Sequence, residues 1–205
     1  MKKIDVKEFW NWFVENEDKL MDIDNIDKEE AQDLMEEFET VLGQYSEGLS
    51  FEIGDLGKNG RDIIFSAEGD PDYFDDVIEL FEESPSLDFW TIIPFRQGKG
   101  GRVIIEFEGY RYNSKDLWFI PLESEDSSDS IGLRIGVSDY DEYSEDQEIA
   151  IYTLIETMVG EFECSTLLEY FELIKLPDNP EGEGYINLSN LPEYFAWFWD
   201  NRNKE

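Results

Sequence analysis

Residues 49–95 read LSFEIGDLGKNGRDIIFSAEGDPDYFDDVIELFEESPSLDFWTIIPF, and no other part of the chain has a clearer order of structural signals. A short alternating segment at 49–53 predicts a β-strand. Asn59-Gly60, which follows it, is a strong signal for a hairpin turn. Residues 61–67 are rich in β-branched and aromatic side chains and predict the returning strand.

The second half of this segment predicts a helix and one more strand. Asp70 is placed to cap the helix, Pro71 suits its first turn, and the helix is expected to run to about Glu83. Residues 89–95 predict a further strand. The order of elements in this part of the chain is therefore β-β-α-β.

The same order recurs in residues 117–176, although few residues are identical. Strands are predicted at 117–122 and 131–137, a helix from about 145 to 162, and a last strand at 170–176. The recurrence indicates either an internal duplication or a chance repeat of a common order, and both interpretations stay open.

The flanking regions add helices at both ends. Amphipathic patterns predict helices at about 5–20 and 27–44, with Asp5 and Glu8 as a capping box for the first and Asp27 as the cap of the second. Residues 177–205 are expected to form a tail with a Pro- and Gly-rich loop and a short helix. We predict an α+β fold in which N-terminal helices (1–48) precede the two β-β-α-β units, with antiparallel sheet and helices packed on one face. Residues 1–205 are expected to form a single compact domain, with the two units as a pseudo-duplication.

The composition is strongly acidic. The 205 residues include 51 acidic and 16 basic side chains and no histidine, for a net charge of −35. Aromatic residues make up 15%, which indicates a folded core, because disordered acidic chains usually lack them. Such a charge repels nucleic acid and anionic membranes, so neither is expected as a partner, whereas a basic protein or cations are favoured. The chain lacks a secretion signal and a long apolar run, so we expect a cytoplasmic location.

Several kinds of chemistry are excluded by residue type. Without histidine and with Cys164 as the sole cysteine, the chain has no catalytic triad, disulfide, or His- or Cys-ligated metal site. Nucleotide-binding motifs are also missing. We therefore predict no catalytic residue and no cofactor. Carboxylates could still hold Ca²⁺ or Mg²⁺, but acidic residues also favour helix N-termini for electrostatic reasons.

Two groups of residues are candidates for binding a partner. Acidic side chains crowd one turn and the helix start after it. Aromatic side chains crowd the final predicted helix, and helical spacing requires either that some of them are exposed or that the helix is buried on more than one side, against the sheet or the other end of the chain. We expect the acidic group to steer a basic partner and two tryptophans to anchor it. The predicted partner-binding residues are Asp139, Asp141, Glu142, Glu145, Asp146, Trp197 and Trp199.

A third candidate is the glycine-rich segment RQGKGGR at residues 96–102. Its three positive charges follow a stretch of many acidic residues, and a flexible loop of this kind is able to cradle an anion. The candidate anion-binding residues are Arg96, Lys99 and Arg102. The alternative is a hairpin turn whose basic residues relieve local repulsion.

The chain also resembles a group of uncharacterised bacterial proteins that have no established activity. The stretches that carry the resemblance are FWNWFVENE (9–17), LSFEIG (49–54), IIFSAEG (63–69) and WTIIPFR (90–96), and more loosely NLSNLP (187–192). This resemblance implies a bacterial cytosolic α+β protein and transfers no catalytic residues.

These observations favour a non-enzymatic binding or regulatory protein for a basic protein partner. The alternative is a carboxylate-based cation-binding protein or metal-dependent enzyme, which requires a pocket lined by acidic groups. A third hypothesis, a decoy that mimics DNA phosphates, requires rows of acidic groups at phosphate spacing.

Overall fold

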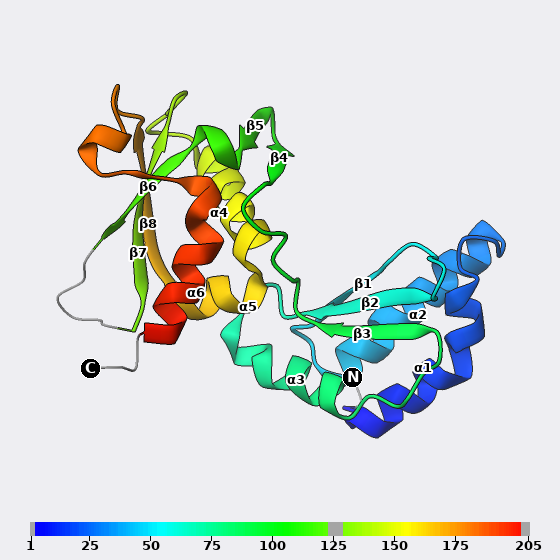
Figure 1. Ribbon diagram of the computed structural model, residues 1–205. Helices are drawn as coiled ribbons and strands as arrows, with labels where there is room; N and C mark the ends of the chain where they lie inside the picture. Colours follow the sequence, from blue (N-terminus) through cyan, green and yellow to red (C-terminus); the bar gives the residue numbers. More distant parts are fainter. Residues whose placement is uncertain (1–2, 123–128, 202–205) are drawn as a thin grey trace. The chain divides into compact units, whose positions relative to one another are not determined.

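The computed structural model describes residues 3–122 and 129–201 (Figure 1). The chain forms two compact units, Met1–Arg96 (unit 1) and Gln97–Glu205 (unit 2). Each unit holds one of the predicted β-β-α-β segments. The sequence predicts that the whole chain forms one compact domain. The division into two compact units does not test that arrangement, which stays a prediction.

Unit 1 begins with two helices and continues into a three-stranded sheet. Its elements are α1 (Val6–Met21), α2 (Lys28–Tyr45), β1 (Ser50–Ile53), β2 (Arg61–Ser66), a 3-10 turn (Pro71–Tyr73), α3 (Phe74–Glu82) and β3 (Trp90–Pro94). The strand order is β1-β2-β3, with β1 antiparallel and β3 parallel to the central strand.

Local side-chain chemistry determines where the helices of unit 1 begin. The Asp5 carboxylate accepts from the Glu8 backbone N–H, and the Glu8 side chain accepts from the Asp5 N–H, which forms the predicted capping box. Asp27 caps α2, and Asp70 caps the turn that leads into α3. The starts of all three helical segments therefore confirm the sequence prediction.

The core of unit 1 is built from aromatic rings. Phe9, Phe13 and Phe38 of the two N-terminal helices are fully buried. The rings of Phe9 and Phe38 lie 5.7 and 6.4 Å from that of Phe65 in β2, and the Phe13 ring lies 5.9 Å from Phe38, between centroids. The Trp10 indole donates to the Leu80 carbonyl of α3 over 3.1 Å. The three helices therefore share one face of the sheet.

Unit 2 contains a hairpin, a four-stranded sheet and three helices. Its elements are β4 (Ile104–Phe107), β5 (Tyr110–Asn113), β6 (Trp118–Leu122), β7 (Ile131–Val137), α4 (Glu145–Val159), α5 (Glu161–Leu167), β8 (Leu168–Lys175), β9 (Ile186–Asn187) and α6 (Leu191–Asn201), with 3-10 turns at Ser114–Asp116, Glu181–Glu183 and Leu188–Asn190. The hairpin β4-β5 is separate from the sheet, whose order is β8-β7-β6-β9.

Two glycine and proline positions shape this unit. The predicted helix 145–162 ends early at Gly160, whose φ of 104° breaks the helical path, so that α5 is a separate helix. Pro121 of β6 has no N–H to donate, and a proline in a strand favours an edge position or a bulge. It pairs with Leu133 of β7, while β9 on the other side of β6 reaches only Trp118 and Phe119. At Pro121 the strand is locally an edge, where the missing N–H costs no ladder bond.

The α+β class and the repeated β-β-α-β order are confirmed. In both units the first two strands are antiparallel and the closing strand is parallel to the second one, so each sheet is mixed rather than wholly antiparallel. The reason is that a helical crossover returns the chain to the same end of the sheet, whereas a tight hairpin reverses it.

The core of unit 2 is mainly aliphatic. Alternate residues of β7 are buried, and α4 lies against them with a fully buried stripe. The fully buried aliphatic side chains of these two elements include Leu133, Ile135, Ile151, Leu154 and Ile155. Figure 1 shows α4 and α6 on the same side of the sheet. Among the described residues, no helix is both long and apolar enough to cross a membrane.

Candidate functional site

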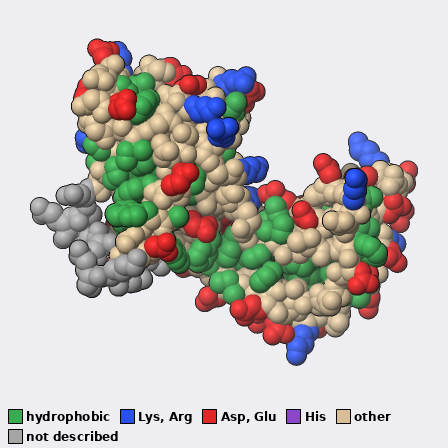
Figure 2. Space-filling model, in the orientation of Figure 1, with side chains coloured by type: hydrophobic (Ala, Val, Ile, Leu, Met, Phe, Trp, Pro, Cys, Tyr) green, Lys and Arg blue, Asp and Glu red, His purple; other side chains and the backbone are tan. Residues whose placement is uncertain are grey.

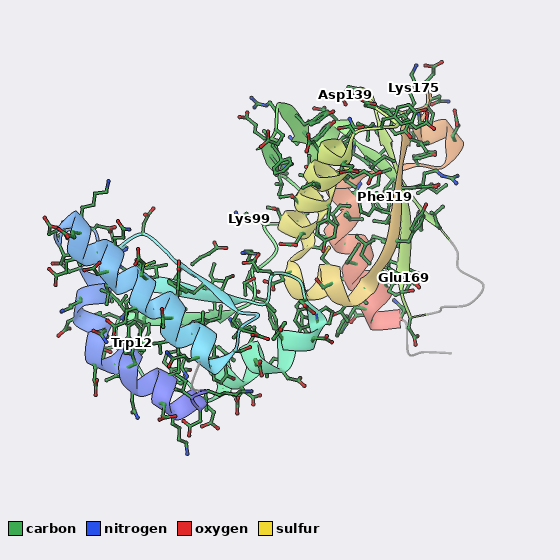
Figure 3. All side chains as sticks on the ribbon, turned by 180° about the vertical axis from the view of Figure 1, so that it is seen from behind. Trp12, Lys99, Phe119, Asp139, Glu169 and Lys175 are labelled. Atoms are coloured by element: carbon green, nitrogen blue, oxygen red, sulfur yellow. The ribbon has the colours of Figure 1, made fainter. Side chains whose placement is uncertain are left out.

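The predicted acidic turn lies between β7 and the first turn of α4, and all five of its candidate carboxylates are exposed. Figure 3 shows Asp139 and Lys175 at one end of the unit 2 sheet and Glu169 at the other. Ser144 caps α4 by accepting from the Gln147 N–H over 3.1 Å. The acidic side chains of the first turn therefore lie at the positive end of the helix dipole.

Two of the five acidic residues also hold the turn together. Gln147 is fully buried, and its amide donates to the Tyr112 hydroxyl over 2.6 Å and to the Asp139 carbonyl over 3.2 Å. Tyr112 donates in turn to the Asp139 carboxylate, and Gln147 accepts from the Asp141 N–H. Burial, with the Asp139 charge as a smaller cause, raises the pKa of Tyr112 to about 12. Sequence reasoning missed this network, because its partners are up to 35 residues apart.

A metal site was the main alternative for the acidic clusters. Across residues 3–122 and 129–201, no group of three or more Asp, Glu or Cys side chains is arranged to hold a metal ion. The described carboxylates lack the convergent oxygen ligands that Ca²⁺ or Mg²⁺ requires. Acidic residues at this turn are also favoured by the positive end of the helix dipole.

The glycine-rich segment packs against α4 instead of forming an open loop. The backbone N–H groups of Lys99 and Gly100 donate to the Thr157 and Met158 carbonyls near the end of α4, over 2.8 and 3.1 Å. A Cβ atom on Gly101 would lie 1.9 Å from the Ser189 carbonyl oxygen, so this glycine permits close backbone contact. These donors satisfy the helix C-terminus and are not directed at an anion.

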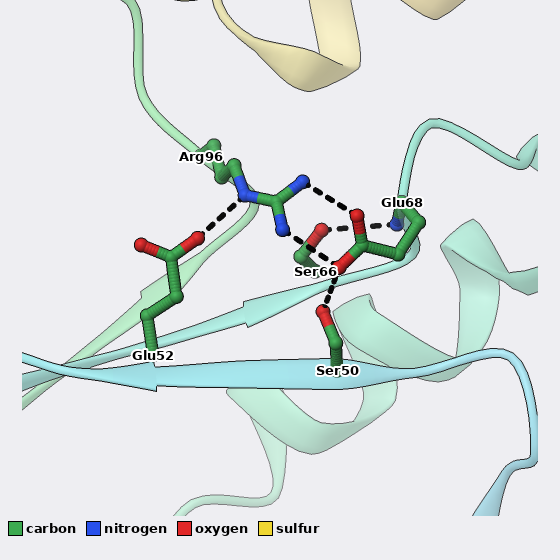
Figure 4. A network of polar contacts seen from close by, with 5 residues as sticks. All are labelled: Ser50, Glu52, Ser66, Glu68 and Arg96. Atoms are coloured by element: carbon green, nitrogen blue, oxygen red, sulfur yellow. Dashed lines mark hydrogen bonds and ion pairs between the residues drawn. The ribbon is translucent and has the colours of Figure 1, made fainter.

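Arg96 is engaged by carboxylates on the outer face of the unit 1 sheet (Figure 4). Its guanidinium donates to Glu52 over 2.6 Å and to both oxygens of Glu68 over 2.6 and 2.9 Å, while Ser50 donates to Glu68 as well. The hydrogen bonds from Arg96 are the main reason that the pKa of Glu68 lies below its ordinary value. Lys99 and Arg102 are exposed. The Arg96 guanidinium binds carboxylates of its own unit, so these contacts do not support the anion-binding hypothesis.

Helix α6 presents aromatic rings to solvent, which is one of the two arrangements that its helical spacing allows. Phe195 is buried in the core, whereas Trp197 and Trp199 are 58% and 38% exposed. Trp197 stacks on Tyr194 at 5.9 Å between ring centroids, and Trp199 lies 6.3 Å from the Phe162 ring of α5. The two tryptophans therefore project from different sides of the helix.

Trp199 belongs to a pocket of about 310 Å³ that is lined by α5, α6 and the last residue of α4. Four apolar residues and two carboxylates complete its lining, and no basic side chain is among them. The lining residues are Val159, Glu163, Pro192, Phe195, Ala196, Trp199 and Asp200. This pocket is the strongest candidate site in unit 2, because it joins an exposed aromatic ring to acidic groups. Glu163 is 36 residues from Trp199 in sequence, so sequence reasoning could not place them together.

Unit 1 carries a hollow of a different kind, of about 440 Å³. It lies beside the C-terminal half of α1 and the segment that leads into β3, where Val14 and Phe89 are 46% and 64% exposed. Glu17, Asp18 and Asp88 line it too. An exposed aromatic residue near acidic groups is thus present in each unit, and Phe89 provides a matched comparison for the tryptophans of α6.

Negative charge is shared by the two units. Unit 1 contains 27 acidic and 8 basic residues, and unit 2 contains 24 and 8. On the face drawn in Figure 2, acidic side chains are spread over both units. The field is therefore general and is not confined to the turn at 139–146.

Comparison of the chain with protein-family models, curated proteins and solved structures found no match.

Proposed function

We propose that this chain is a non-enzymatic binding protein whose partner is a basic protein. The observation that carries the proposal is the pair of exposed tryptophans on α6, Trp197 and Trp199, in a strongly acidic unit. Trp199 lies beside Glu163 and Asp200 in one pocket. Tryptophan is among the residues that most often dominate the binding energy of protein interfaces. Acidic groups around such anchors favour a partner of opposite charge.

We expect the net charge and the tryptophans to act on different steps of binding. Net charges of −19 and −16 on the two units attract a basic partner over about a Debye length, roughly 8–10 Å in physiological salt. They also repel a second copy of the chain, which disfavours self-association through this surface. The field is expected to set the rate of encounter, and the tryptophans the lifetime of the complex.

The first test compares two variants in capture experiments from cells of the source organism. Proteins retained by the wild type at physiological salt are identified, purified and titrated against the Trp197→Ala/Trp199→Ala variant and against Phe89→Ala. We expect at least about tenfold weaker binding for the double variant and less than twofold change for the control. Failure to retain any basic protein, or equal binding by all three chains, would contradict the proposal.

A kinetic experiment tests the acidic turn separately. Asp139 and Asp141 are left intact because they support the turn, and Glu142→Gln, Glu145→Gln and Asp146→Asn are combined. Association is expected to slow several-fold at low salt while dissociation is unchanged, and the difference should vanish at high salt. A change confined to dissociation would show that this turn does not steer the partner.

A further inference from the structure

We infer that the pocket beside Trp199 receives the side chain of a single lysine or arginine from the partner. This inference rests on the proposed function and names the chemical group that the α6 surface recognises. It is carried by the lining of the pocket, which combines an apolar floor, an aromatic ring and two carboxylates.

The apolar part of the lining suits the stem of a long cationic side chain. Val159, Pro192, Phe195 and Ala196 supply hydrocarbon surface, and Phe195 is only 2% exposed, so its ring is held by the core. Lysine and arginine bury their methylene stems on such surfaces while the charged end stays near water. A pocket of about 310 Å³ has room for one side chain and not for a helix.

The polar part of the lining suits the charged end. Glu163 and Asp200 are exposed carboxylates from two different helices, and Trp199 adds a ring whose face attracts cations. None of the seven described lining residues is basic, so every charge that they contribute is negative. A neutral apolar side chain would fill the floor, but it would gain nothing from the attraction that the two carboxylates and the ring exert on a positive charge.

The two helices that supply the carboxylates of the pocket, α5 and α6, are anchored in the core of unit 2 before any partner binds. Cys164 and Leu167 of α5 and Leu191 and Phe195 of α6 are almost fully buried in the core of unit 2. Side chains on such helices need little reordering on binding, which lowers the entropic cost. The cation is therefore expected to meet a largely preformed site.

The test uses small probes on the full chain, followed by the indole N–H signals of the six tryptophans in NMR spectra. N-acetyl-lysine N-methylamide and the arginine analogue are compared with N-acetyl-norleucine N-methylamide, which has a similar stem and no charge. We expect both cationic probes to shift the Trp199 signal with a Kd of about 1–10 mM, and the norleucine probe to bind about tenfold more weakly.

Matched variants locate the binding site. Glu163→Gln combined with Asp200→Asn should weaken the lysine probe about three- to tenfold, and Trp199→Leu should remove its effect on this pocket. Glu193→Gln is the control, because Glu193 is an exposed carboxylate of the same helix outside the pocket lining. Added salt should weaken the lysine probe and leave the norleucine probe unchanged.

Three results would overturn the inference: equal binding of lysine and norleucine probes, equal effects of Glu193→Gln and the double carboxylate variant, or no shift of the Trp199 signal. These results are distinct from failure of the proposed function. If a basic partner binds through α6 but the probes do not discriminate, the pocket inference fails alone. If the probes discriminate but no basic protein is retained, the proposed function fails and the pocket remains a cation site.

Discussion

The two units have the same β-β-α-β topology, yet their cores are made of different side chains. Unit 1 packs the rings of Phe9, Phe13, Phe38 and Phe65, and unit 2 packs aliphatic side chains from β7 and α4. The comparison shows that the order and polarity of the elements determine this topology, whereas the identity of the buried residues is interchangeable as long as the space is filled.

The units differ most in what they add to the shared topology. Unit 1 adds α1 and α2 before its strands, and unit 2 adds α6 after them. The candidate site of unit 2 uses α6, for which unit 1 has no counterpart. Shared topology therefore does not imply shared function here, because the proposed binding surface lies on an added element.

The largest expected effect on stability comes from creating a cavity in the core of one unit at a time. Phe38→Ala removes a fully buried ring that stacks on Phe51 at 3.8 Å, and it should cost unit 1 about 3–5 kcal/mol of unfolding free energy. Leu154→Ala should cost unit 2 about 2–5 kcal/mol. Denaturant titrations followed by the amide NMR signals of each unit measure both costs separately.

In each variant we expect the mutated unit to lose its signals at lower denaturant than the other one. Simultaneous loss of both units in both variants would show that they unfold as one cooperative body. The division into two units would then have no energetic meaning.

The second largest effect concerns two arginines that occupy different environments. Arg61 of β2 is almost fully buried, and it donates to the Met21 and Gly54 carbonyls over 2.9 and 2.8 Å and pairs with Asp24. Arg61→Met should cost about 3 kcal/mol, because it leaves buried carbonyl oxygens without a donor. Arg134 of β7 pairs with Glu172 on a half-exposed face, so Arg134→Met should have a small effect. Thermal unfolding of both variants measures the difference, and equal losses would contradict this reading of burial.

The next prediction compares a glycine that has free space around its backbone with one that lies against another backbone segment. A Cβ on Gly43 of α2 meets nothing within 4 Å, and Gly43→Ala should stabilise unit 1 by about 0.5–1 kcal/mol through helix propensity. Gly101→Ala should destabilise unit 2 by about 1–3 kcal/mol, because the added atom would overlap the Ser189 carbonyl. Denaturant midpoints measure both changes, and stabilisation by Gly101→Ala would show that this segment is free to move.

The smallest expected effect depends on pH and belongs to unit 1. Arg96 holds the pKa of Glu68 below its ordinary value of 4.5, so this carboxylate stabilises the folded state above that pH. The contribution is lost as the pH falls through the lowered pKa. Because Glu68 is exposed, Glu68→Gln should cost only a few tenths of a kcal/mol at pH 7.

The difference between wild type and Glu68→Gln should therefore shrink as the pH falls below about 4. Thermal unfolding at matched ionic strength between pH 7 and about pH 3 measures it. A difference that grows in acid would reverse the assigned sign.

Local sequence signals were sufficient for most elements and for part of the candidate site. The capping box of Asp5 and Glu8 and the caps at Asp27 and Asp70 lie within a few residues of the helices that they start. Helical spacing alone indicated that the aromatic residues of the last helix are either partly exposed or buried on more than one side, and in the structure Trp197 and Trp199 are partly exposed. These sequence signals need no information from distant parts of the chain.

Contacts over long sequence separations were not predictable in this way. Gln147 is hydrogen-bonded to Tyr112, which is 35 residues away in the sequence, and Arg61 is hydrogen-bonded to Met21, which is 40 residues away. Neither pair has a local sequence signature. The glycine-rich segment at 96–102 indicated a flexible loop, but at Lys99 and Gly100 its donors are used by the end of α4. Composition indicates how freely a backbone is able to move, and it does not indicate which carbonyl groups lie beside it.

By itself the sequence determined the α+β class, the β-β-α-β order, the helix starts and the negative charge, because each depends on residues near one another or on composition alone. Only the tertiary structure decided the parallel closing strands, the separate α5 after Gly160 and the pocket that joins Glu163 to Trp199. The physical reason is that a pocket is defined by side chains from elements that meet only after packing, and the relative position of such elements depends on the whole core.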